Sequence, residues 1–243
     1  MNLPDKKKIF EKIITRIRRL IKTKIFRSKK SFSQSGEDII IQYVLNSMNI
    51  LNPNYLDIGA NHPVLFNNTY LFYKNNCRGI CVEPNPVLAK IIKKKRSKDI
   101  VINKGISAGF AGAMKFYVFS SHTLSTFSKE DVNNYISNGE KLLKTIDVEV
   151  IPLNELINKL FKGITPDIIS IDVEGWDFDI LKTLDFEKYR PAIICAETLT
   201  YSPIKKEQKK NQELIKFLLH KNYFLYADTY INSIFVDKYL YFK

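Results

Sequence analysis

The chain has 243 residues, 45% of them hydrophobic, which is enough for one α/β domain with a buried core. Its three cysteines, Cys77, Cys81 and Cys195, lack the spacing of a disulfide framework or a metal site, so they indicate a reducing compartment. Of the net charge of +13, residues 1–30 contribute +10, so the rest of the chain carries only +3. Enzymes that act on nucleic acids more often carry their basic residues around the site, so we expect no nucleic-acid partner.

Residues 1–30 are the first predicted element, a basic amphipathic helix. Ile9, Ile13 and Ile17 recur at helical spacing with lysines and arginines between them. Such a helix suits an anionic membrane surface, and packing on its own domain or on a second copy is the alternative. Recurring charges argue against a signal peptide, and no run approaches the ~20 apolar residues of a membrane span. We therefore expect a cytoplasmic protein, with peripheral contact with the inner face of the membrane left open.

From residue 31 to residue 243, short apolar runs alternate with helical patterns. This alternation predicts a single α/β domain, in which a mostly parallel sheet is covered by helices on both faces. The predicted strands are Tyr55–Ile58, Gly79–Val82, Ile100–Asn103, Lys115–Phe119, Asp147–Val150, Asp167–Asp172, Ala192–Glu197, Tyr223–Asp228 and Ile231–Val236. The predicted helices are Asp38–Met48, Thr69–Asn75, Pro86–Lys95, Lys129–Leu143, Leu153–Phe161, Phe178–Leu184 and Lys209–His220.

Two segments depart from this alternation. The last two strands are joined closely around Asp228–Tyr230, which predicts an antiparallel hairpin at an edge of the sheet. Residues 120–145 are polar and rich in serine and threonine, and we interpret them as an insertion that folds over a site and contacts its substrate.

A nucleoside site is predicted where the first two strands of the sheet end. The strand Tyr55–Ile58 runs into a turn at Gly59, and Glu83 ends the next strand, where it can accept hydrogen bonds from both hydroxyls of a ribose. A dinucleotide loop would need glycine where Asn61 and Val64 stand. A ligand with a ribose but no phosphates fits better, and S-adenosylmethionine is such a ligand.

A second polar cluster follows the strand Asp167–Asp172. Asp172, Glu174 and Asp177 lie close together after a hydrophobic strand, and such a set would be costly in a core. The three acids therefore indicate the mouth of a site.

Together these motifs resemble the FkbM-type methyltransferases. The matching pieces, in the family's order, are Ser33–Asp38, Asp57–Asn61, Val82–Pro84, Gly105–Ser107 and Ile171–Gly175. The resemblance implies a class I methyltransferase (Rossmann-like) fold, a three-layer sandwich around a seven-stranded sheet with an antiparallel edge strand. It also implies S-adenosylmethionine as methyl donor and O-methylation of a sugar hydroxyl on a glycan, a polysaccharide or a glycosylated metabolite.

The same resemblance assigns the cofactor contacts. Asp57, Gly59 and Asn61 would border the methionine part, and Glu83 would hold the ribose. The adenine would be flanked by Pro84, Asn85, Ile106 and Ser107, while Gln34 and Glu37 would close over the cofactor. Asp172 would lie beside the methyl group.

A sugar hydroxyl is a weak nucleophile, so a base or a metal ion is expected. The candidates for the base are Asp172, Glu174, Glu197, His122 and His62. We favour Asp172, as base or as the carboxylate that positions the acceptor, with His122 second. Mg²⁺ held by carboxylates is an alternative that we do not favour, and we assign no metal ligand.

Three other functions are weighed. Asp177 and Asp179 form a DxD sequence, which a metal-dependent glycosyltransferase could use, although acids at a helix start often serve only as caps. Asn52–Tyr55 resembles a nucleic-acid methyltransferase motif only in part and precedes the first strand. Residues 1–30 also allow a non-enzymatic membrane-binding module. The acceptor and the oligomeric state stay open.

Overall fold

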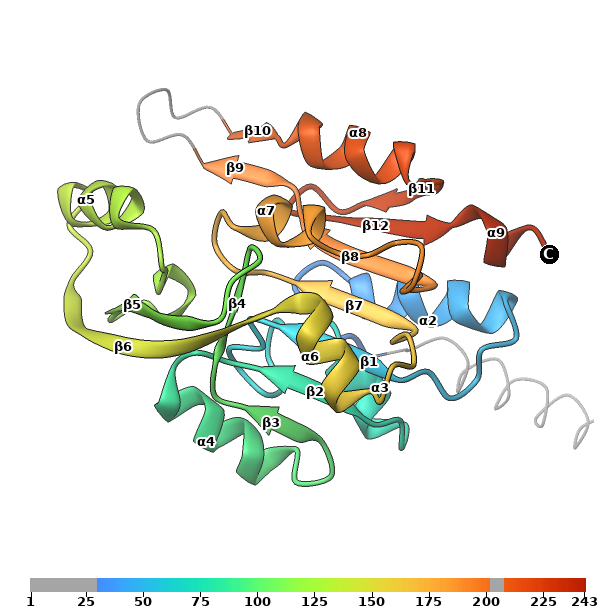
Figure 1. Cartoon of the computed structure of the whole chain (residues 1–243), viewed down its shortest axis with the longest axis horizontal. Coiled ribbons are helices and arrows are strands. Elements are labelled where there is room, and N and C mark those ends of the chain that lie inside the picture. Colours follow the sequence, from blue (N-terminus) through green and yellow to red (C-terminus); the bar gives the residue numbers. More distant parts are fainter. Residues whose placement is uncertain (1–29, 202–207) are drawn as a thin grey trace, which may run out of the picture. The chain divides into compact units, whose positions relative to one another are not determined.

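The computed structural model describes residues 30–201 and 208–243 (Figure 1). Residues 32–243 form one unit, and all contacts given below lie within it. The helix predicted over residues 1–30 falls almost entirely outside the described residues, and its membrane contact stays a prediction. Within the described ranges, no helix has the length and apolar character needed to cross a bilayer.

A seven-stranded sheet has the order β11-β12-β8-β7-β1-β2-β3. Neighbouring strands pair in parallel except at β12, which runs antiparallel to both β8 and β11. The predicted mostly parallel sheet with an antiparallel hairpin at its edge is therefore confirmed. The strands are β1 (Tyr55–Ile58), β2 (Gly79–Val82), β3 (Ile100–Ile102), β7 (Ile168–Ile171), β8 (Ile193–Glu197), β11 (Tyr223–Asp228) and β12 (Asn232–Asp237).

Helices cover both faces of this sheet because its central strands are apolar at successive positions. Leu56 and Ile58 of β1 belong to a core shared with α6 (Leu153–Leu160), α7 (Asp177–Lys182) and α8 (Gln212–His220). Tyr55 belongs to the core of the opposite face, with α2 (Glu37–Ser47) and α3 (Tyr70–Lys74). On β2, Cys81 packs against Ile92 of α4 (Pro86–Lys95). Alternate residues of one strand thus serve opposite layers.

A second sheet has the order β4-β6-β5. It contains β4 (Gly105–Ser107), β5 (Gly112–Phe119) and β6 (Leu142–Pro152), with a 3-10 helix, η1 (His122–Leu124), and α5 (Lys129–Ser137) between β5 and β6. The predicted strands Lys115–Phe119 and Asp147–Val150 belong to this sheet rather than the main one. β5, β6 and α5 lie beyond the edge at which the parallel strands end (Figure 1).

Two predicted helices are shorter than expected, for local reasons. The helix that starts at Lys129 ends at Ser137, because Gly139 (φ 88°) turns the chain toward β6. The helix predicted from Lys209 begins at Gln212, where the Asn211 side chain accepts a hydrogen bond from the Leu214 amide. The residues before it form β10 (Gln208–Lys210), which pairs with β9 (Leu199–Tyr201); the short α9 (Lys238–Tyr241) follows β12.

Candidate active site

A cavity of about 660 Å³ lies where β1, β2, β7 and β8 end and β12 begins. This volume is in the usual range for small-molecule sites. The segment between β5 and β6 supplies another wall, through His122–Ser125, Phe127, Tyr135, Asn138 and Glu140. The crevice predicted at the carboxyl ends of the strands and the polar segment over residues 120–145 therefore meet at one site.

Most of the predicted site residues line this cavity. From the cofactor set these are Gln34, Asp57, Gly59, Asn61, Glu83, Pro84 and Asp172, and from the candidates for the base they are His62, His122, Glu174 and Glu197. Four other predicted cofactor residues do not line it: Glu37, Asn85, Ile106 and Ser107.

Contacts within the protein account for the positions of these four. Glu37 is buried and accepts hydrogen bonds from Ser35, Thr229 and Asn232, so it joins the start of α2 to the β11–β12 turn. Asn85 caps α4. The Ser107 hydroxyl donates to a backbone carbonyl, and Ile106 borders a small neighbouring pocket that shares Gly59 and Pro84 with the main cavity.

The turn after β1 needs glycine for a reason that the sequence did not reveal. Gly59 has φ 78°, and a Cβ there would lie 1.8 Å from the backbone oxygen of Asp172. The nearest obstacle to a side chain at this position is therefore the backbone that follows β7. Gly59 thus allows the ends of β1 and β7 to meet at the floor of the cavity.

Glu83 is almost fully buried at the end of β2. Its Oε2 accepts from the Asn61 amide and its Oε1 from the Asn85 amide, both at 2.8 Å. Burial raises the pKa of Glu83 to about 7, against the effect of these two hydrogen bonds. Each carboxylate oxygen keeps one lone pair, so Glu83 can accept two further hydrogen bonds from a diol.

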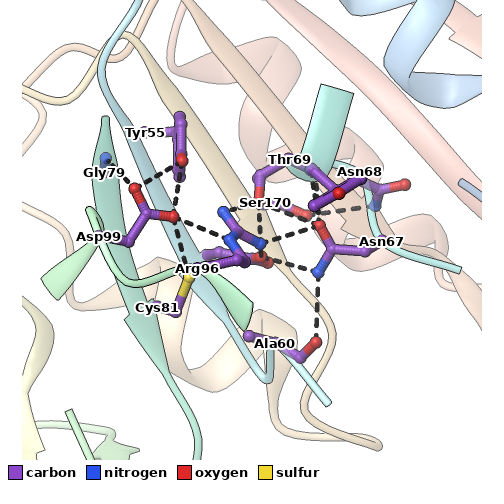
Figure 2. A network of polar contacts seen from close by, with 12 residues as sticks. Tyr55, Ala60, Asn67, Asn68, Thr69, Gly79, Cys81, Arg96, Asp99 and Ser170 are labelled. Atoms are coloured by element: carbon purple, nitrogen blue, oxygen red, sulfur yellow. Dashed lines mark hydrogen bonds and ion pairs between the residues drawn. The ribbon is translucent and has the colours of Figure 1, made fainter. Parts of the chain in front are cut away.

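Asp57 lies at the border between the cavity and a buried polar network centred on Arg96. Figure 2 shows the Arg96 guanidinium between Asp99 and Tyr55 on one side and Asn67 and Thr69 on the other. Arg96 is fully buried, and its Nη1 lies 3.3 Å from Asp57 Oδ2. Sequence reasoning missed this residue, because an arginine after Lys93–Lys95 looks like part of an exposed basic run.

Three carboxyl groups gather at the β7 and β8 side of the cavity: Asp172, Glu174 and Glu197. Burial first, and then the charge of Asp57, raises the pKa of Asp172 to about 6. Burial and the charge of Asp172 raise the pKa of Glu174 well above its usual range and that of Glu197 to about 9. Asp172 is nevertheless an exposed residue that lines the cavity, so contact with water weakens the effect of burial on its pKa without changing the direction of the shift.

The DxD acids do not share a site. Asp177 is buried and its Oδ1 accepts from the Val173 amide, whereas Asp179 is on the surface in an ion pair with Lys182. Neither lines the cavity, so the geometry does not support the glycosyltransferase alternative. In the described part of the chain, no three His, Cys, Asp or Glu side chains converge as metal ligands would.

The family model described as the methyltransferase FkbM domain matches residues 57–225, from β1 to β11. The chain belongs to this family. Its fold is accordingly the class I methyltransferase fold, and S-adenosylmethionine is the methyl donor of these FkbM methyltransferases.

Among curated proteins none matches this FkbM chain, but solved structures do. A TehB-like methyltransferase from Corynebacterium glutamicum is 9% identical, with a TM-score of 0.43 over 94% of this chain and 97% of its own. An O-methyltransferase from Bacillus cereus is 11% identical, with a TM-score of 0.39 over 90% and 88%. A Thermotoga maritima O-methyltransferase is 8% identical, with a TM-score of 0.43 over 88% and 69%.

The residues of the cavity fit S-adenosylmethionine. Glu83 has free lone pairs for a ribose, and the turn at Gly59 leaves Asp57 open to the cavity beside it. Among the described lining residues there is no lysine or arginine, the side chains that often balance the charge of a ligand's diphosphate. The donor set of this FkbM protein therefore suits a nucleoside that carries a cationic tail and no phosphate.

Proposed function

We propose that this protein is an O-methyltransferase that acts on a sugar hydroxyl. The observation that carries the proposal is that Asp172, a candidate base, lines the same cavity as Glu83 and Asp57. The wall formed by the segment between β5 and β6 combines aromatic rings, Phe127 and Tyr135, with polar groups, Asn138 and Glu140. A sugar offers an apolar ring face and several hydroxyls, so such a wall suits it.

The bound cofactor supplies an electrophilic methyl group, so the protein has to orient the acceptor and remove its proton. Asp172 is suited to take that proton, because a carboxyl with a pKa near 6 is ionised at neutral pH and is more basic than an ordinary aspartate. Glu197, with a pKa of about 9, is protonated at neutral pH and would donate a hydrogen bond to the acceptor instead. Holding the hydroxyl in line with the methyl group adds the benefit of proximity.

Mass spectrometry of sugars tests this function. The purified protein is incubated with S-adenosylmethionine carrying a deuterated methyl group and with a panel of free sugars and glycan fragments. We expect a deuterated methyl ether on one hydroxyl of one acceptor class. A label found only on amines or carboxyls would contradict O-methylation.

Glu83→Ala is the control for the cofactor site in the same assay. Since Glu83 lines the cavity and is proposed to hold the ribose, the variant should lose S-adenosylmethionine binding and all product. Its circular dichroism should stay that of the wild type. Calorimetric affinity close to that of the wild type would overturn the assignment of Glu83 to the ribose.

A further inference from the structure

The buried network around Arg96 contains the charged residues Arg96, Asp57 and Asp99, and of these three only Asp57 lines the cavity. Arg96 ends α4 and is completely shielded from solvent. Its Nε donates to Asp99 Oδ2 at 2.8 Å, and Asp99 in turn accepts from the Tyr55 hydroxyl and the Gly79 amide. An unpaired buried charge is very unfavourable, so these bonds hold Arg96 in one place.

Arg96 fixes the orientation of the Asp57 carboxylate from one side. Asp57 Oδ2 accepts three hydrogen bonds: from Arg96 Nη1 at 3.3 Å, Asn67 Nδ2 at 3.0 Å and the Thr69 hydroxyl at 2.6 Å. Arg96 Nη2 donates to the oxygen of that hydroxyl at 2.9 Å, and of the two acceptors within reach of the hydroxyl proton, Asp57 Oδ2 at 2.6 Å is closer than Asn67 Oδ1 at 3.1 Å. All three bonds end on the same oxygen, which defines the rotation of the carboxylate.

The other oxygen, Asp57 Oδ1, has no hydrogen-bond partner within the described residues. The Asp57 side chain keeps 6% of its surface exposed, and Asp57 lines the cavity. Oδ1 is thus the oxygen that a ligand can reach. In the amino-acid part of S-adenosylmethionine only the ammonium can donate to it, because the carboxylate of that part would be repelled.

Arg96 also stabilises the loop between β1 and α3 through hydrogen bonds. Asn67 Oδ1 accepts from Arg96 Nη1 at 3.2 Å and from the amides of Thr69 and Tyr70 at the start of α3. Asn67 Nδ2 also donates to the Ala60 carbonyl, which joins the two ends of the loop. Removing the guanidinium would loosen both the carboxylate and the loop that borders it.

We propose that Arg96 is the positioning residue of the cofactor site, and that it acts through Asp57 Oδ1 on the ammonium of the methionine part. This inference rests on the proposed use of S-adenosylmethionine in this cavity. Arg96 does not touch the ligand; together with Thr69 it sets the direction of the carboxylate that does. A charge-assisted hydrogen bond depends steeply on that direction.

Two ligands separate this role from a merely structural one. S-adenosylhomocysteine carries the amino-acid part, and 5′-methylthioadenosine has the same adenosine without it. We expect Arg96→Lys to weaken S-adenosylhomocysteine binding about tenfold, since lysine cannot make the four bonds of the guanidinium. Binding of 5′-methylthioadenosine, measured by the same calorimetry, should change less than about twofold.

Thr69→Val and Arg78→Lys complete the experiment. Thr69→Val removes one hydrogen bond to Asp57 Oδ2 and keeps the shape of the side chain. It should weaken S-adenosylhomocysteine binding selectively, to a smaller degree than Arg96→Lys, and it serves as the test variant if Arg96→Lys does not fold. Arg78 also lies over the Tyr73 ring but makes no bond to Asp57, so Arg78→Lys should bind both ligands normally.

The outcomes are distinct. Equal weakening of both ligands, or unchanged S-adenosylhomocysteine affinity in the folded variants, would overturn the role of Arg96. A wild-type protein that binds neither ligand would instead refute the proposed function.

Discussion

At the scale of single residues, Asp172 is the group whose ionisation should govern the reaction. Its pKa is raised to about 6, by burial first and then by Asp57, so the basic form is lost as the pH falls through about 6. We expect kcat to rise with pH through that value and then to level off. A rise near pH 9 would point to Glu197 as the base instead.

Asp172→Asn tests the same residue directly. Without a base, kcat should fall by about 10²- to 10⁴-fold. Because a raised pKa in the folded state means that ionisation opposes folding at neutral pH, the melting temperature should stay the same or increase. His122→Asn is the matched control in the cavity wall, and its kcat should still fall as the pH drops below about 6. If this fall in kcat disappeared in His122→Asn alone, His122 rather than Asp172 would be the base.

At the scale of elements, the contact between the ends of β1 and β7 depends on Gly59. Gly59 and Gly163 share φ 78°, but the nearest atom to a Cβ is a backbone oxygen at 1.8 Å for Gly59 and a side-chain oxygen at 3.8 Å for Gly163. Gly163→Ala should therefore cost only the left-handed strain, about 1 kcal/mol. Gly59→Ala should cost more than ~3 kcal/mol, because β1 and β7 must separate. Urea unfolding measures both, and equal losses would contradict the steric argument.

The sequence predicts the elements whose signals are local. The strand that ends at Gly59 and the helix that starts at Pro86 are indicated by apolar runs, a turn residue and a cap within a few positions. The second sheet was not predicted, because paired residues of β4 and β6 are 45 positions apart and β4 has only three residues of its own. The residues of the site likewise differ in whether a local sequence signal predicts them. Glu83 and Asp172 stand at strand ends, whereas Arg96 and Asn67 matter only through contacts that the fold creates.

At the scale of the molecule, the distribution of charge separates the chain into two regions. The net charge of +13 is concentrated in residues 1–30, whereas the lining of the cavity holds six acids and, among its described residues, no lysine or arginine. Two of the six are matched by the protein, Asp57 by Arg96 and Glu83 by backbone amides. Of the others, Glu140 accepts a hydrogen bond from the Ser121 hydroxyl, and Asp172, Glu174 and Glu197 lie together near the ends of β7 and β8.

This imbalance predicts that the enzyme discriminates against anionic acceptors. A phosphate about 6 Å from one uncompensated carboxylate costs on the order of 1–3 kcal/mol, which lowers kcat/KM by about 10- to 100-fold relative to the neutral sugar. The measurement compares the acceptor found by mass spectrometry with its phosphorylated form. Glu140→Gln should reduce the difference in kcat/KM between the two acceptors, because it removes a carboxylate from the wall formed by the segment between β5 and β6. High salt should reduce this difference further. Equal rates for both acceptors would mean that the acids that carry charge at neutral pH, Asp172 among them, are neutralised when the site is filled, by protons or by a bound cation. Adding Mg²⁺ at fixed ionic strength would tell these two causes apart.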